Sequence, residues 1–200
     1  HSLLGNVPYH LLFNFNTPWD FVEMPSQIME NWVYQRETHD LFVAHGAERM
    51  PDELFEKVVK ARTFATGYAT MRQLEFAKMD LQLHTAFALN GRSLDEFVAD
   101  ATKDFTFDFG IPVRSIIRTF SHLFSPDGYD AGYYSYKWSE VIAADAFALF
   151  KEKGIFDRTV ADAFRTILEA GAARDVMELF VEFRGREPCD EFLLKQDGLL

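Results

Sequence analysis

The sequence contains a single cysteine, Cys189, among its 200 residues. One cysteine excludes an internal disulfide framework and is compatible with a reducing compartment. No apolar run approaches the roughly 18 residues that a membrane span needs, and no signal-peptide pattern is present. We therefore predict a cytoplasmic protein that has no membrane partner.

Basic residues are also scarce. Lysine and arginine total 20 against 31 aspartate and glutamate residues, so the formal net charge is −11. Nucleic acids and anionic membrane surfaces are polyanions and would repel such a chain. The charge balance argues against both as the main partner.

Glycine and proline are few, at 11 and 7 residues, while 48% of the chain is hydrophobic. Long periodic segments rich in alanine, leucine, glutamate and lysine favour helix over strand. We predict one all-α, multi-helix domain of about eight helices with irregular loops. The helices are expected near residues 20–36, 52–60, 67–87, 93–104, 130–153, 157–171, 174–183 and 188–195, with a short extended piece near 11–15.

The chain begins with His1 instead of methionine, and residues 1–4 resemble the last turn of a helix that stops at Gly5. We expect the sequence to be the C-terminal part of a longer polypeptide.

An aromatic stretch at residues 128–138 follows His122 closely. If Pro126–Gly128 is a turn and a helix begins after it, Tyr129, Tyr133 and Tyr136 fall within about 60° of one another on that helix. Such a stripe is common in protein cores. The alternative is a row of phenol O–H donors beside a loop that carries a histidine.

A narrow polar stripe of Glu23, Gln27 and Glu30 lies on the otherwise apolar helix predicted from Asp20. The stripe either faces solvent or faces a cation. In the second case Glu23 would give its carboxylate to a metal ion, with Gln27 or Glu30 steadying the site.

The familiar catalytic motifs are missing. The sequence has no His-x-x-x-His or Cys-x-x-Cys pair, no phosphate-binding glycine loop and no nucleophile elbow. The remaining histidines are scattered. The residues by themselves therefore show no complete catalytic set.

Five segments closely resemble the thimet oligopeptidase family of zinc metallopeptidases, and the oligopeptidase A and peptidyl-dipeptidase branch is the most similar. They are residues 20–32 (DFVEMPSQIMENW), 71–76 (MRQLEF), 120–123 (FSHL), 128–140 (GYDAGYYSYKWSE) and 183–188 (FRGREP). The resemblance covers essentially the whole chain, in order. It implies part of a larger, neurolysin-like or thimet-like helical peptidase.

The resemblance also implies roles. In the family a His-Glu-x-x-His helix supplies two zinc ligands and the catalytic glutamate, and the third ligand corresponds to Glu23. His1 corresponds to a non-ligating histidine that often follows that helix, so residues 1–200 would begin just after it. His122, Tyr129 and Tyr136 match residues that hold the substrate backbone and stabilise the oxyanion, and Tyr133 matches another family tyrosine.

Two hypotheses follow. The first is part of a zinc-dependent oligopeptidase that hydrolyses short peptides and is inactive without its missing N-terminal part. The second is a non-catalytic helical interaction module, or one half of a split peptidase.

Overall fold

The computed structural model of the chain describes residues 1–87, 91–111, 115–125 and 128–200. These residues form helices, turns and irregular segments with no strand among them, which confirms the all-α prediction. They gather in two compact units, residues 1–64 with 138–200 and residues 65–137. None of the helices in this described part is both long enough and apolar enough to cross a bilayer.

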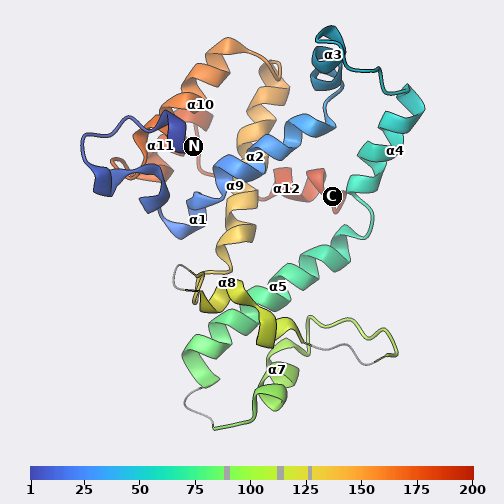
Figure 1. Cartoon of the computed structure of the whole chain (residues 1–200), viewed down its shortest axis with the longest axis vertical. Helices are drawn as coiled ribbons and strands as arrows, with labels where there is room; N and C mark the ends of the chain where they lie inside the picture. Colours follow the sequence, from blue (N-terminus) through green and yellow to red (C-terminus); the bar gives the residue numbers. More distant parts are fainter. Residues whose placement is uncertain (88–90, 112–114, 126–127) are drawn as a thin grey trace. The chain divides into compact units, whose positions relative to one another are not determined.

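The first unit contains most of the helices in Figure 1, with α10 and α11 side by side. Its elements are the 3-10 turns Ser2–Leu4, His10–Leu12, Asn14–Asn16 and Asn31–Tyr34, the helices α1 (Trp19–Val22), α2 (Met24–Glu30), α3 (Arg36–Ala44), α4 (Asp52–Arg62), α10 (Arg158–Ala170), α11 (Val176–Arg184) and α12 (Glu191–Gln196), and residues 138–153 of α9 (Ser135–Lys153). The extended piece expected near residues 11–15 is wrong, because two 3-10 turns occupy that region.

The core of the first unit is built from α1, α2, α9, α10 and α11. Trp32 closes one side of it. Its ring lies edge-on to Phe147 and Phe150, at centroid distances of 4.7 and 5.0 Å, and its indole N–H donates to the carbonyl of Ile155 at 3.1 Å. The single polar atom of this large side chain is thus satisfied while the partly buried ring packs against the core.

The helix predicted over residues 20–36 is in fact three short elements, with a break at Glu23. Pro25 lies in the first turn of α2, as expected, because proline is tolerated only where no backbone N–H is needed. The same ring prevents α1 from continuing, since it removes the hydrogen bond to the carbonyl of Phe21. The break makes Glu23 the N-cap of α2.

Local sequence patterns fixed many helix ends correctly. Ser93 and Glu96 form the predicted reciprocal capping box of α7 (Leu94–Thr102), and hydrogen bonding to Ser93 lowers the pKa of Glu96. The Asp157 carboxylate accepts from the N–H of Val160 at 2.9 Å, and Gly171 ends α10 at a φ of 51°.

A buried ionic network links α9 to the segment after α11. Asp145 has no exposed surface. Its carboxylate accepts from Nε of Arg184 at 2.8 Å, from both terminal nitrogens of Arg186 at 2.6 and 2.8 Å, and from the N–H of Cys189 at 2.8 Å. Burial alone would lower the pKa of Arg184, but its hydrogen bonds to Glu152 and Asp145 raise it. The FRGREP segment therefore supplies the counter-charges of this carboxylate.

The second unit consists of α5 (Thr66–Gln82), a π-helical turn (Leu83–Phe87), α7, a 3-10 turn (Ile116–Thr119), α8 (Ser121–Phe124) and the first residues of α9. Figure 1 shows α7 packed beside α5. A second apolar core holds them together, formed by Phe76, Met79, Phe97, Val98, Ile117, Phe120, Leu123 and Tyr133.

Candidate active site

Four of the predicted site residues lie together in the second unit. The ring centroid of His122 is 6.2 Å from those of Tyr129 and Tyr133 and 6.3 Å from that of Tyr136. The ring of Tyr136 lies 5.0 Å from both other tyrosine rings. We call these four residues the aromatic cluster.

The prediction that the three tyrosines share one face of a helix is wrong. Helix α9 begins at Ser135, and residues 130–134 form a turn, so Tyr129 and Tyr133 precede the helix. Ala131 adopts a left-handed conformation with a φ of 57°, which a helix does not allow. The turn, not a helical face, brings the rings together. Of the turn expected at Pro126–Gly128, Pro126 and Asp127 lie outside the described residues.

Burial separates the members of the aromatic cluster. Tyr133 is only 9% exposed and belongs to the second core, where its ring contacts Phe76 and Phe120. Tyr129 and Tyr136 are partly exposed, and His122 is exposed. The core interpretation thus fits Tyr133, whereas the other three rings form a surface above it.

Gly128 allows the backbone beside Tyr129 to approach the backbone of His122 and Ser125. The N–H of Tyr129 donates to the carbonyl of His122 at 2.6 Å, and that of Gly128 donates to Ser125 at 2.9 Å. A Cβ atom at position 128 would lie 2.7 Å from the carbonyl oxygen of His122 and 2.9 Å from that of Ser125. Only glycine permits this close approach of backbone to backbone.

Asp80 is part of this region, and the sequence reasoning missed it. Its side chain has no exposed surface. Oδ1 accepts from the N–H of Ala131 and Oδ2 from the N–H of Tyr133, each at 2.9 Å. A usable clue was the acid directly after Met79, a residue of the periodic apolar positions of this helix, with His84 at i+4.

Glu23 belongs to the first unit. It is partly buried between α1 and α2, and its Oε2 accepts a hydrogen bond from the Ser26 hydroxyl at 3.2 Å. Gln27 is also partly buried, whereas Glu30 is exposed to solvent. Across the described ranges no group of three histidine, cysteine or acidic side chains could hold a metal ion.

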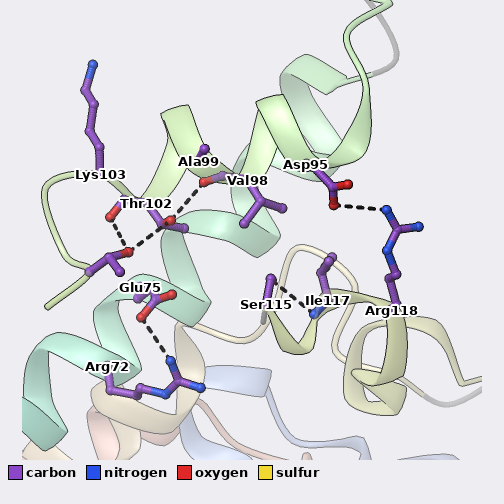
Figure 2. Close-up of a pocket in the computed structure, with 11 residues that line it drawn as sticks. Arg72, Glu75, Asp95, Val98, Ala99, Thr102, Lys103, Ser115, Ile117 and Arg118 are labelled. Carbon is purple, nitrogen blue, oxygen red and sulfur yellow. Dashed lines mark hydrogen bonds and ion pairs between the residues drawn. The ribbon is translucent and has the colours of Figure 1, made fainter. Parts of the chain in front are cut away.

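A separate pocket of about 710 Å³ opens between α5, α7 and the 3-10 turn Ile116–Thr119. Figure 2 shows its charged side chains in pairs, Arg72 with Glu75 and Arg118 with Asp95, at 3.3 and 2.9 Å. Lys103, which also lines it, pairs with Asp100. Because each of these cations has a carboxylate partner, the pocket offers no evident attraction for an anion, and its lining includes none of the aromatic cluster.

Comparison with known proteins gives a consistent picture. The sequence model of peptidase family M3 matches residues 1–199. Organellar oligopeptidase A, chloroplastic/mitochondrial, of Arabidopsis thaliana is 43% identical over 196 residues, which are 92% of this chain and 24% of that protein. Oligopeptidase A of Escherichia coli is 40% identical over 211 residues, covering 98% and 30%. Dipeptidyl carboxypeptidase of Salmonella typhimurium is 34% identical over 204 residues, covering 100% and 30%.

Proposed function

Because this chain belongs to peptidase family M3, we propose that it is the C-terminal part of the catalytic domain of a zinc-dependent oligopeptidase that hydrolyses peptide bonds in short peptides. The chain spans 24–30% of the relatives named above. The proposal therefore places the His-Glu-x-x-His helix upstream of His1, in a segment that acts as this chain's partner.

The observation that carries the proposal is the aromatic cluster. Peptide hydrolysis develops negative charge on the carbonyl oxygen of the substrate, and fixed hydrogen-bond donors stabilise that charge. Tyr129 and Tyr136 are partly exposed and adjacent to the exposed ring of His122. We assign oxyanion stabilisation to Tyr136, together with Tyr129 and His122, and support from beneath to the buried Tyr133.

Glu23 fits one position of a zinc site. Catalytic zinc is held by three protein ligands, and glutamate oxygens are among them. The Ser26 hydroxyl donates to the backbone carbonyl of Glu23 at 2.8 Å and also lies 3.2 Å from Oε2, so it provides an outer contact of the kind that orients a ligating carboxylate. When bound, zinc supplies Lewis-acid polarisation of the water and of the scissile carbonyl.

The first test is Tyr136→Phe in the full-length enzyme. Loss of one oxyanion donor lowers kcat by about 10² to 10³, and the zinc content is expected to stay the same. Tyr134→Phe is the matched control, because Tyr134 is an exposed neighbour with no place in the aromatic cluster. An unchanged kcat for Tyr136→Phe would remove this tyrosine from the mechanism.

The second test is Glu23→Ala, with the exposed Glu37→Ala as its control. Removing a metal ligand should weaken zinc binding by more than the roughly 100-fold that outer-contact mutations cost. Metal content after dialysis against a graded chelator gives the readout. A Glu23→Ala enzyme that keeps its full zinc complement would show the ligand assignment to be wrong.

Short peptides remain the proposed substrates, and the cytoplasmic location stays a prediction, since one of the relatives is named as organellar.

A further inference from the structure

Asp80 is a buried carboxylate whose position needs an explanation. Removing a charged carboxylate from water is costly unless hydrogen bonds or opposite charges compensate for it. Asp80 lies near the end of α5 with no exposed surface. Within the described part of the chain, its two oxygens are met by two backbone N–H groups and a histidine ring.

The two N–H groups come from one short turn. Oδ1 holds Ala131 and Oδ2 holds Tyr133, so the carboxylate bridges residues that are two apart in the chain. Among the described residues, Ala131 is one of two non-glycine residues with a left-handed backbone, a conformation that is uncommon for alanine and costs energy unless its surroundings stabilise it. Hydrogen bonds to a charged acceptor are among the stronger ones and can enforce it.

This turn determines where the aromatic cluster lies. The N–H of Gly132 donates to Tyr129 at 2.9 Å, and that of Ser135 donates to Gly132 at 3.0 Å. Helix α9 then begins at Ser135, one residue before Tyr136. The backbone held by Asp80 therefore connects all three tyrosine rings.

His84 contacts the same carboxylate oxygen, Oδ1, that accepts from the N–H of Ala131. Its Nδ1 lies 2.9 Å from both Oδ1 and the carbonyl oxygen of Asp80, one turn earlier in the helix. With the proton on Nδ1, the ring donates to the backbone carbonyl of Asp80 and lies against its carboxylate. The π-helical turn Leu83–Phe87, in which His84 lies, places the ring there.

We propose that Asp80, which contacts His84, is a positioning residue. Its hydrogen bonds hold the backbone of residues 131–133 so that Tyr129 and Tyr136 can donate to the substrate oxyanion. Asp80 itself does not touch the substrate. This inference rests on the proposed function, because it assigns a role toward the same tyrosines.

The test is Asp80→Asn in the full-length enzyme. Asparagine keeps the shape of the side chain but presents an NH₂ group where one backbone N–H now donates. Misplacement of catalytic groups by about 1 Å can cost on the order of 10²-fold. We expect kcat per zinc-loaded, folded enzyme to fall about 10- to 100-fold, with KM and zinc content nearly unchanged. A purely structural role would lower the yield of folded enzyme and leave this kcat unchanged.

The matched control is Glu75→Gln. Glu75 lies on the same helix and makes an ion pair with Arg72, and within the described residues no hydrogen bond or ion pair joins it to the turn. It undergoes the same change from carboxylate to amide. Its kcat should equal that of the parent enzyme.

A second readout does not depend on catalysis. Hydrogen exchange in peptides that cover residues 129–134 reports the protection of the Ala131 and Tyr133 amides. Exchange there should be at least about tenfold faster in Asp80→Asn, and unchanged in Glu75→Gln. If Asp80→Asn fails to fold, His84→Ala provides a milder variant, with the same two effects at smaller size.

The outcomes separate the two proposals. If Tyr136→Phe is impaired while Asp80→Asn and His84→Ala keep full kcat, the positioning role is overturned and the proposed function stands. Impaired kcat with unaltered exchange at 129–134 also overturns it, because the effect would not pass through this backbone. If Tyr136→Phe is fully active, the proposed function fails and the positioning role toward it fails as well, even where exchange increases.

Discussion

Among the described residues, each of the two compact units buries one aspartate completely, and the two units compensate its charge in different ways. In the first unit, Asp145 is surrounded by the guanidinium groups of Arg184 and Arg186. In the second, Asp80 is met by two backbone N–H groups and by His84. Both side chains have 0% exposure, so burial alone does not distinguish them.

The difference lies in what each aspartate holds. The guanidinium groups bound by Asp145 are on long side chains that come from the end of α11 and the segment after it, so the network fastens one element to another. Asp80 binds the main chain itself and therefore sets backbone angles in a turn. We infer that Asp145 contributes mainly to stability, whereas Asp80 contributes mainly to the geometry of the candidate site.

The largest expected effect on stability is that of Asp145→Ala. Removing one partner of a buried ion pair leaves the other charge uncompensated and costs about 3–5 kcal/mol. The midpoint of thermal unfolding should fall strongly, while kcat of the enzyme that remains folded should not change. Asp162→Ala is the control, because its pair with Arg158 is exposed and such pairs contribute about 0–1 kcal/mol. Equal shifts for the two variants would contradict the network's role.

A smaller effect is expected for Gly128→Ala in the second unit. The added methyl group would lie within 2.9 Å of two carbonyl oxygens, and neither belongs to a side chain that could rotate away. Such overpacking typically costs about 1–3 kcal/mol, and the shifted loop should also lower kcat. In Gly67→Ala the new methyl group meets no atom within 4 Å, so this control should be neutral or slightly stabilising. Parent-like kcat and stability for Gly128→Ala would show that the loop adjusts easily.

The smallest effect, and the one that sharpens the comparison most, is that of Ala131→Gly. Glycine relieves a left-handed strain of about 1–2 kcal/mol but gives the unfolded chain more freedom, worth about 0.4–1 kcal/mol. The single variant should therefore lie within about 1 kcal/mol of the parent enzyme. In the Asp80→Asn background the same change should be more favourable, by a coupling of about 0.5 kcal/mol or more. A double-mutant cycle of unfolding free energies measures this coupling, and strict additivity would show that Asp80 does not hold Ala131 in place.

Much of the fold follows from local sequence. The helix from Asp52, the capping box at Ser93, the cap at Asp157 and the end of α10 at Gly171 all depend on residues within one turn of each other. Such interactions act over a few residues and can be read without knowledge of the packing. The motifs in segments 20–32 and 128–140 likewise pointed to the family, which the match over residues 1–199 shows.

Tertiary structure alone decided the rest. The start of α9 at Ser135 depends on the left-handed Ala131, whose N–H is held by a carboxylate 51 residues earlier in the chain. A helical period could not reveal this, because an acid on a helix ordinarily faces solvent. The sequence therefore identified Tyr129, Tyr133 and Tyr136 as a group. Only the folded chain showed that a turn hydrogen-bonded to Asp80 brings their rings together. The physical reason is that such long-range hydrogen bonds form only once the core has packed.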